Sequence, residues 1–323
     1  MMRAMLQEEI RKAAEVIGEA DALAISCHVS PDGDALGSAL GLAHAARAAG
    51  KEAVVSFGTP FVVPPSLEFL DIEPLVRPSA FPEEPAVMVV FDVGSFDRLV
   101  ELGSSAKRAG TLIVVDHHVT NEGFGDIQLI DGSVAASGQL AVYLLEELGW
   151  PIDEKVATCL LTAIVTDTGR FQYSSTSPET LRVAARLVEA GARPELIGQK
   201  VYESVPFAYL KAASIVLGRA VLEEELGLVW SWIGHQDLAA SGARYEDMDG
   251  LIDDIRIARE AGVAALLKQV DKGWKVSLRS RGAVDVGSMA VARGGGGHHN
   301  ASGFTSTSPL EEVVESIRAQ LRG

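Results

Sequence analysis

Carboxylates and imidazoles are concentrated in four segments of the sequence. Three of these segments directly follow short apolar runs, and the fourth lies in a helical pattern. In an open parallel sheet, groups at the carboxyl ends of the strands meet in one ligand crevice, so we expect these side chains to lie together. They are His28, Asp32 and Asp34 in the first segment, Asp92 in the second, Asp116, His117 and His118 in the third, and Asp167 in the fourth.

This mixture of side chains is typical of a site for divalent metals. No cysteine belongs to the set, which disfavours a structural zinc site. Oxygen-rich sites with one or two histidines suit Mn²⁺ or Mg²⁺, with Co²⁺ or Zn²⁺ as substitutes. Six ligands are too many for one metal that must also hold water and substrate. They suit two metals about 3.5–4 Å apart that share a bridging carboxylate and a nucleophilic water.

Several of these acidic residues have a simpler explanation when each is taken alone. Asp32 and Asp34 lie in a Pro-Asp-Gly-Asp segment, and such residues form turns. Asp34 is also a candidate cap for a helix that begins at Ala35, and Asp92 is a candidate cap for the turn after its strand. Asp167 in an apolar helical run is costly unless it is paired or metal-bound. The joint occurrence favours the metal site.

A second candidate site lies near the C-terminal end, where four consecutive glycines precede two histidines and an asparagine. Glycines allow close backbone approach to a ligand, and a helix beginning at about His298 would point its free N–H groups at an anion. With Arg279 and Arg281 on the preceding strand, the segment favours a phosphate or nucleotide cradle, and a flexible loop is the alternative. The candidate substrate-binding residues in this segment are Gly295, Gly296, Gly297, His298, His299, Asn300 and Ser302.

The elements that position these residues follow an α/β pattern. Apolar runs rich in Val and Ile predict strands buried on both faces of a mostly parallel sheet flanked by helices. A smaller α/β domain follows, so we expect residues 1–190, a linker over 191–206, and residues 207–323. The expected strands are 22–26, 53–57, 86–91, 111–115, 227–233, 264–270 and 274–279, with a hairpin turn at 271–273. The expected helices are 35–50, 135–148, 154–166, 178–190, 195–202, 207–220 and 310–321.

The composition indicates an acidic globular protein. The 323 residues include 28 Lys+Arg and 44 Asp+Glu, a formal net charge of -16. Such a surface repels long duplex nucleic acid, whereas a small phosphate ligand held by bound cations remains compatible. Two cysteines are too few for a disulfide framework, which favours a reducing, cytoplasmic setting. No apolar run approaches the ~20 residues of a membrane span, and a homodimer is left open.

The order and spacing of these motifs resemble the DHH phosphoesterase superfamily. Asp116-His117-His118 matches the triplet that gives the superfamily its name, and Gly294–Gly303 resembles the signature of the DHH-associated domain. The resemblance covers essentially the whole chain. It is strongest to the NrnA-type oligoribonucleases, which also remove the 3′-phosphate of 3′-phosphoadenosine 5′-phosphate (pAp). It implies a phosphodiesterase and phosphatase that acts on pAp and on short RNA or DNA oligonucleotides.

The resemblance also implies a role for each residue. Asp116 would orient a ligating imidazole, His118 would bind substrate or protonate the leaving oxygen, and Arg279 would contact substrate. His298 falls on the histidine of the signature, whereas His299 falls on a variable position. The implied ligands are His28, Asp32 and Asp92 for one Mn²⁺ and Asp34, Asp92, His117 and Asp167 for a second, with Mg²⁺ or Co²⁺ as substitutes.

The sequence is also compatible with other functions. RecJ-like single-strand exonucleases share the metal motifs but usually carry an added oligonucleotide-binding domain, and phosphodiesterases of cyclic or linear dinucleotides are further relatives. A non-catalytic nucleotide-binding regulator would keep the glycine segment and tolerate loss of metal ligands. Because all six ligand positions are intact, the sequence favours the enzyme.

Overall fold

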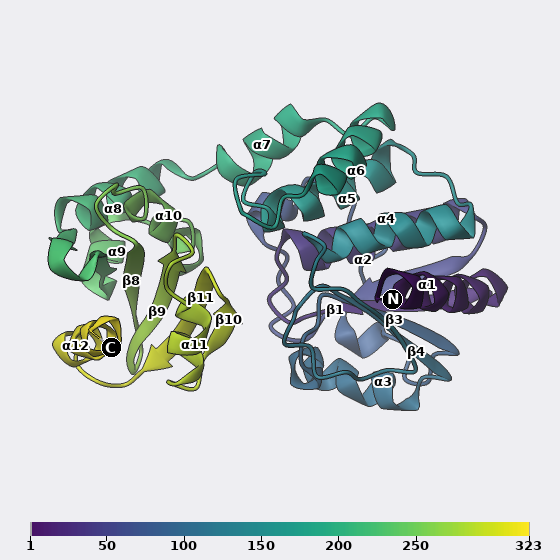
Figure 1. Ribbon diagram of the computed structural model, residues 1–323, viewed down its shortest axis with the longest axis horizontal. Helices are drawn as coiled ribbons and strands as arrows, with labels where there is room; N and C mark the ends of the chain where they lie inside the picture. The colour runs from purple at the N-terminus through teal and green to yellow at the C-terminus, as the bar shows by residue number, and fades with distance from the viewer. Residues whose placement is uncertain (1, 323) are drawn as a thin grey trace. The chain divides into compact units, whose positions relative to one another are not determined.

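The computed structural model describes residues 2–322, apart from the side chains of residues 2–4 and of His298 (Figure 1). The chain divides into two compact units, Met1–Ser204 and Val205–Gly323. Each unit is an α/β arrangement around one sheet, as the sequence predicts. The first sheet is parallel, as expected, and the second is mixed. Among the described residues, no helix is both long and apolar enough to cross a membrane.

The first unit is built on a parallel sheet with strand order β2-β1-β3-β4-β5. Every residue of its central strand β3 is buried, as expected for an apolar run covered on both faces. The strand β5 was not predicted, since it has only four residues and lies at the edge of the sheet. The strands are β1 Ala22–Cys27, β2 Glu52–Ser56, β3 Val87–Phe91, β4 Thr111–Asp116 and β5 Ile127–Ile130.

Helices cover both faces of this sheet (Figure 1). Leu23 and Ile25 of β1 face one core, which the larger group of helices completes, whereas Ala24 faces the other. This alternation is the period-two pattern of a strand. The larger group is α1 Met2–Glu19, α2 Gly33–Ala48, α4 Ser137–Leu148, α5 Glu154–Asp167, α6 Pro178–Glu189 and α7 Pro194–Tyr202, and the 3-10 helix η3 Phe96–Leu102 and α3 Gly103–Arg108 cover the opposite face.

The segment predicted as a linker, residues 191–206, is largely part of the first unit. It contains α7, and Ile197 of that helix is buried in the core of the first unit together with Ala192. The division between units falls after Ser204. The Gly191–Pro194 segment therefore separates two helices of one unit.

The second unit is built on a sheet with strand order β10-β11-β9-β8-β7-β6. The predicted hairpin turn joins β8 to β9, because Val270 pairs with Gly273. Helices α8 and α10 contact β7 and β8 on one face, and α11 and α12 form a core with the other. The elements are β6 Val221–Glu223, β7 Leu228–Ile233, β8 Val263–Val270, β9 Gly273–Ser280, β10 Gly296–His298, β11 Ala301–Ser306, α8 Phe207–Gly218, α9 His235–Ser241, α10 Leu251–Ile255, α11 Val286–Val291 and α12 Leu310–Leu321.

The second half of the glycine run, Gly296 and Gly297, belongs to strand β10, so the helix considered from about His298 is not formed. β10 pairs antiparallel with β11 through a tight turn at His299 and Asn300. Two of the four glycines are needed for this pairing, since a Cβ on Gly295 would lie 2.2 Å from the Gly303 carbonyl oxygen and one on Gly297 would lie 2.5 Å from the carbonyl oxygen of Ala301. An added Cβ on Gly294 or Gly296 would meet nothing within 4 Å. Close approach of backbone to backbone therefore explains Gly295 and Gly297.

The packing of α2 against α5 predicts a stability effect at Gly37. A Cβ at this position would lie 2.5 Å from the carbonyl oxygen of Cys159 on α5. We expect Gly37→Ala to lower the free energy of unfolding by about 1–3 kcal/mol, because the two backbones would have to separate. Thermal unfolding followed by circular dichroism measures the change.

The matched control is Gly18→Ala in α1, where the nearest atom to an added Cβ is a Leu148 methyl group at 3.9 Å. Replacing a helical glycine that has space for a Cβ should leave the free energy of unfolding unchanged or raise it by up to about 1 kcal/mol. Equal stability of the two variants would contradict a tight contact between α2 and α5.

Candidate active site

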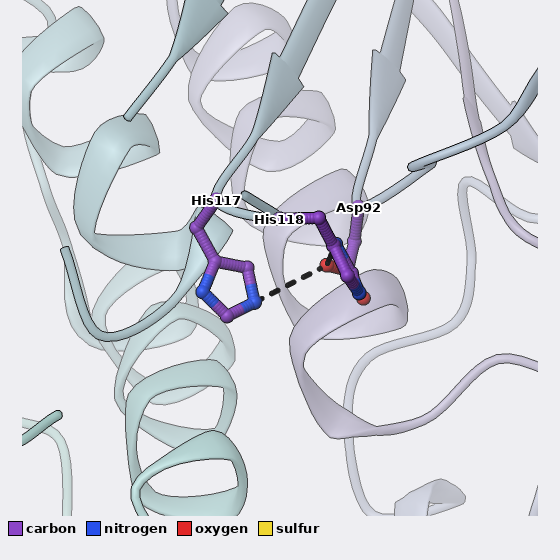
Figure 2. A group of neighbouring side chains, drawn as sticks. All are labelled: Asp92, His117 and His118. Carbon is purple, nitrogen blue, oxygen red and sulfur yellow. Dashed lines mark ion pairs between the residues drawn. The ribbon is translucent and has the colours of Figure 1, made fainter. Parts of the chain in front are cut away.

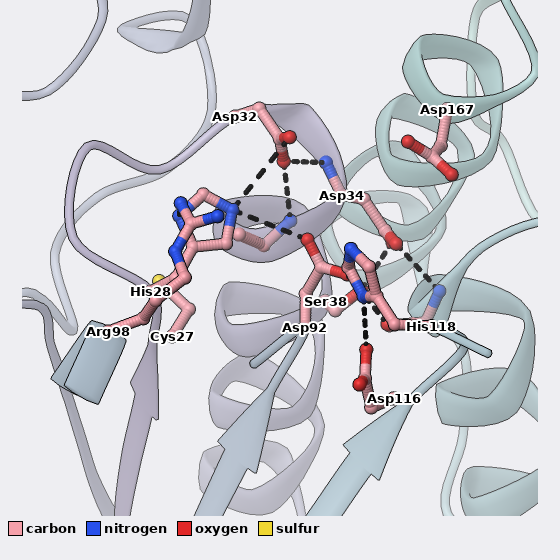
Figure 3. Close-up of polar contacts among 12 residues, drawn as sticks. Cys27, His28, Asp32, Asp34, Ser38, Asp92, Arg98, Asp116, His118 and Asp167 are labelled. Carbon is pink, nitrogen blue, oxygen red and sulfur yellow. Dashed lines mark hydrogen bonds and ion pairs between the residues drawn. The ribbon is translucent and has the colours of Figure 1, made fainter. Parts of the chain in front are cut away.

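The structure brings the predicted metal-site residues of the first unit together at the carboxyl ends of its parallel strands (Figure 3). His28 follows β1, Asp92 follows β3, and Asp116 is the last residue of β4. The other residues come from the ends of adjoining helices and loops. They are Asp32 and Asp34 at the start of α2, His117 and His118 after β4, and Asp167 at the end of α5.

Asp92 is the centre of the group. Its backbone is left-handed, with φ 57, a conformation that Asp tolerates better than most residues. Oδ2 lies 3.4 Å from Nε2 of His28, whereas Oδ1 lies 3.6 Å from Nε2 of His117 and 3.5 Å from Nδ1 of His118 (Figure 2). The two oxygens of one buried carboxylate therefore face different imidazoles, which is the arrangement of a bridging ligand.

Asp34 is fully buried and is held by the start of another helix. Its carboxylate accepts hydrogen bonds from the backbone N–H groups of Ser137 and Gly138, at 2.7 and 2.8 Å. These are the first residues of α4, whose positive dipole end stabilises a negative charge. The cap of α2 is Asp32, which accepts from the N–H groups of Asp34 and Ala35. The alternative explanation of Asp34 as that cap is therefore wrong.

The donor atoms fall into overlapping groups that suit divalent cations. Within each group the ligand atoms lie within 4.8 Å of one another. Burial and the charge of Asp92 raise the pKa of Asp34 to about 7. Burial and the charges of Asp34 and Asp92 raise that of Asp167 well above its ordinary value. Crowded buried carboxylates beside imidazole nitrogens match the ligands that Mn²⁺ and Mg²⁺ prefer. The groups are His28, Asp32 and Asp92; Asp34, His117 and Asp167; and Asp92, His117 and His118.

The imidazole of His28 is oriented by the backbone. Its Nδ1 lies 2.9 Å from the carbonyl oxygen of Val29, so that Nδ1–H donates and Nε2 faces Asp92 and Asp32. Burial opposes a charge on this ring, but hydrogen bonds and Coulombic attraction from Asp32 and Asp92 outweigh it and raise the pKa to about 10. In the metal-free protein His28 therefore holds a proton that a cation would displace.

Asp116 and His118 form a hydrogen-bonded pair beside Asp92. Nδ1–H of His118 donates to Oδ1 of Asp116 at 2.7 Å. Burial disfavours both charges, yet the pair lowers the pKa of Asp116 and raises that of His118. Asn121, which sequence reasoning missed, donates from Nδ2 to Oδ2 of Asp116 at 2.5 Å and to the Val93 carbonyl oxygen at 3.1 Å. Asn121 lies three residues after His118 in the loop that follows the histidine pair, and this proximity was the feature of the sequence that could have identified it.

The candidate substrate residues of the second unit lie on β9 and on the β10–β11 hairpin. Arg279 pairs with Ala301, is about one quarter exposed, and its Nε lies 3.8 Å from Oδ1 of Asp253. The Ser302 hydroxyl is buried and donates to the carbonyl oxygen of Val286, which places it in the core between hairpin and α11. Ser302 thus supports the hairpin.

The turn of the hairpin is held by its own side chains. The Oδ1 atom of Asn300 accepts from the Ser280 hydroxyl at 3.1 Å. Nε2 of His299 lies 3.1 Å from the carbonyl oxygen of Gly282, and the exposed ring faces the loop before α11. The side chain of His298 lies outside the described part of the chain, whereas its backbone pairs with Ala301. These contacts fix the backbone of the glycine segment.

The raised pKa values predict how metal-free protein responds to pH. Asp34 and His28 have folded-state pKa values of about 7 and about 10, both above their ordinary values of 3.8 and 6.5. The folded state therefore binds more protons than the unfolded state, and stability is lost as pH rises through these windows. We expect the melting temperature of the chelator-treated protein to fall between pH 5 and pH 9.

Added Mn²⁺ should raise the melting temperature more at pH 8 than at pH 5, because protons compete with a cation for these ligands. Differential scanning calorimetry of both forms measures the shift. Asp34→Asn, which cannot titrate, should flatten the dependence between pH 5 and pH 7. A Mn²⁺ effect independent of pH would contradict this account of the site.

Known proteins resemble this chain over both units. Residues 22–164 match the DHH family, N-terminal domain, and residues 232–323 match the DHHA1 domain. The "Bifunctional oligoribonuclease and PAP phosphatase NrnA" of Thermus thermophilus is 34% identical over 97% of this chain and 95% of its own. The protein of that name from Bacillus subtilis is 28% identical over 88% of each chain.

A solved structure agrees with these matches. The crystal structure of an exopolyphosphatase-related protein from Bacteroides fragilis superposes with a TM-score of 0.91 at 26% identity, over 98% of this chain and 96% of that one. The two domain matches and the near full-length similarity to the Thermus thermophilus protein confirm the resemblance seen in the sequence motifs, and they show that this chain belongs to the DHH family of phosphoesterases.

Proposed function

We propose that this phosphoesterase hydrolyses short oligonucleotides and pAp with two Mn²⁺ ions. The observation that carries the proposal is the Asp92 carboxylate, whose two oxygens face two separate groups of donor atoms. The names of the relatives support the substrate class, since the NrnA proteins of Thermus thermophilus and Bacillus subtilis are called oligoribonucleases and PAP phosphatases.

The donor groups support a division of labour among the ligands. His28 and Asp32 would hold one cation together with Asp92, and the buried Asp34 would join the ligands of the other. Such a metal pair polarises a phosphoryl group and supplies a water of lowered pKa as the nucleophile. The ligand sets proposed are His28, Asp32 and Asp92 for one ion and Asp34, Asp92, His117 and Asp167 for the other.

His118 is the proposed proton donor. Its Nδ1–H is fixed by Asp116, which leaves Nε2 to face a ligand. The raised pKa favours the protonated ring, so that Nε2–H can be given to the oxygen that leaves the phosphorus. Asp116 and Asn121 act through His118, because they set the tautomer and orientation of its ring.

The second unit is the proposed substrate-binding part. Arg279 offers a guanidinium for a phosphate or a base. The glycine-containing strand β10 pairs with β11 and lies at the edge of the sheet, where backbone N–H groups are available to a ligand. His298, His299 and Asn300 lie at the end of that hairpin. Ser302 is not among the proposed substrate contacts, since its hydroxyl donates to the carbonyl oxygen of Val286.

The charge of the chain supports short substrates over long ones. The formal net charge is -16, and residues 1–206 hold 29 Asp+Glu against 15 Lys+Arg. A long strand brings many phosphates against this surface, whereas a dinucleotide or pAp brings few. The same reasoning disfavours a RecJ-like exonuclease acting on long single strands.

The test is a time course on pAp and on 5′-labelled oligonucleotides from dinucleotides to a strand of ~24 nucleotides, with Mn²⁺ present. We expect kcat/KM to be high for pAp and for dinucleotides to pentanucleotides and to fall with length, because only short substrates escape the acidic surface. Equal kcat/KM for a pentanucleotide and the longest strand would favour the RecJ-like alternative.

A second test is the variant His118→Ala in the same assay. Loss of a proton donor should lower kcat by about 10²–10⁴-fold with little change in KM. The variant should keep its bound Mn²⁺, measured by elemental analysis, since His118 is not among the proposed ligands. Full activity in this variant would show that His118 is not the donor, and loss of metal would show that it is a ligand.

A further inference from the structure

The 3-10 helix η3 places an arginine beside His28, outside the candidate residues named from the sequence. Nη2 of Arg98 lies 2.9 Å from Nδ1 of His28 and 3.4 Å from the Val29 carbonyl oxygen (Figure 3). The backbone makes a second connection, since the Arg98 carbonyl oxygen accepts from the Val29 N–H at 3.0 Å. η3 is thus attached to the end of β1 by both backbone and side chain.

The hydrogen bonds at His28 leave most of the guanidinium available. Nδ1–H of His28 donates to the Val29 carbonyl oxygen, so Nδ1 cannot also accept from Arg98. The Val29 carbonyl oxygen, 3.4 Å from Nη2, is then the acceptor for the Arg98 side chain among the described residues. Arg98 forms no ion pair within that part of the chain. A guanidinium has five N–H donors. Arg98 is exposed, so donors of the guanidinium remain accessible beside His28.

The charge around Arg98 favours an anion. The four carboxylates of Asp32, Asp34, Asp92 and Asp167 match the charge of two divalent cations. The fifth, that of Asp116, is paired with His118, so Arg98 adds a positive charge next to the His28 ring. A cation held beside cations is unfavourable unless a negatively charged group binds between them. A phosphoryl group supplies that charge and accepts the planar donors of arginine.

The backbone of η3 is strained where it presents Arg98. Val100, two residues further on, has φ 50 and ψ -124, a rare conformation for a β-branched residue. Such outliers cluster at functional sites. Ser30 and Asp92, which lie close to His28 in the sequence or in space, also have positive φ.

We propose that Arg98 binds a non-bridging oxygen of the phosphoryl group undergoing hydrolysis, from the His28 side of Asp92. In Figure 3, Arg98 and His118 lie on opposite sides of Asp92, so the two side chains can hold one phosphoryl group from two directions. The inference takes the metal pair from the proposed function, but it concerns any phosphate ester and does not depend on the length of the substrate.

The alternative is that Arg98 only positions His28. The two roles differ in what the variants lose: a phosphate contact affects affinity for phosphate, whereas a positioning role affects affinity for metal. Arg98→Ala removes the guanidinium and Arg98→Lys keeps the charge without the planar donors. The matched control is Arg108→Ala at the end of α3, an arginine whose nearest carboxylates are those of Glu83 and Glu84.

The experiment is isothermal titration of inorganic phosphate into the Mn²⁺-loaded protein, with a separate titration of Mn²⁺ into the chelator-treated protein. We expect Arg98→Ala to weaken phosphate binding at least about tenfold, since a charge-assisted contact is lost, and Arg98→Lys to fall between it and wild type. Mn²⁺ affinity should stay within about twofold of wild type, and KM for pAp should rise in parallel with the phosphate Kd. Arg108→Ala should match wild type in every titration.

Unchanged phosphate affinity in Arg98→Ala, so that wild type binds phosphate no better than the variant, would overturn the proposal. A loss of Mn²⁺ affinity with no change in phosphate affinity at saturating Mn²⁺ would also overturn it, because it would show that Arg98 only positions His28. Because the titration measures phosphate and metal directly, a failure of the oligonucleotide assay would reject the proposed substrate while leaving this result readable.

Discussion

The mutual repulsion of buried carboxylates is the constraint on which the rest of this structure depends. Asp34 and Asp92 are buried, Asp167 lies beside them, and burial with mutual charge raises the pKa of Asp34 and Asp167. A fold accepts that cost only where the backbone compensates it or a cation is to be bound. The compensation is visible at Asp34, where two N–H groups at the start of α4 point at its carboxylate. The parallel sheet brings the remaining ligands to the same edge.

The second requirement is close packing between the helices that carry these ligands. Asp34 lies near the start of α2 and Asp167 ends α5, so their separation depends on how closely the two helices pack. Gly37 allows the backbones to approach, since any Cβ there would meet a carbonyl oxygen of α5. The acidic site is thus connected to the apolar core, and this packing fixes the positions of the proposed ligands Asp34 and Asp167.

The sequence predicted that the acidic and histidine residues lie together because residue type and strand position point to the same place. Asp92 and His117 follow buried strands, and the ends of parallel strands converge whatever the details of packing. Asn121 and Arg98 were missed because their roles depend on contacts between segments distant in sequence or on a loop conformation. The strand β10 was not predicted, and a helix beginning at about His298 was considered in its place, because a run of glycines carries no side-chain periodicity to indicate which element it forms.

The most direct test of this account is a crystal structure of the protein soaked in Mn²⁺, with anomalous differences measured near the manganese absorption edge. The account predicts two peaks that share the Asp92 carboxylate, one beside His28 and Asp32 and the other beside Asp34, His117 and Asp167. A single peak, or two peaks that do not both contact Asp92, would contradict the central role assigned to that residue.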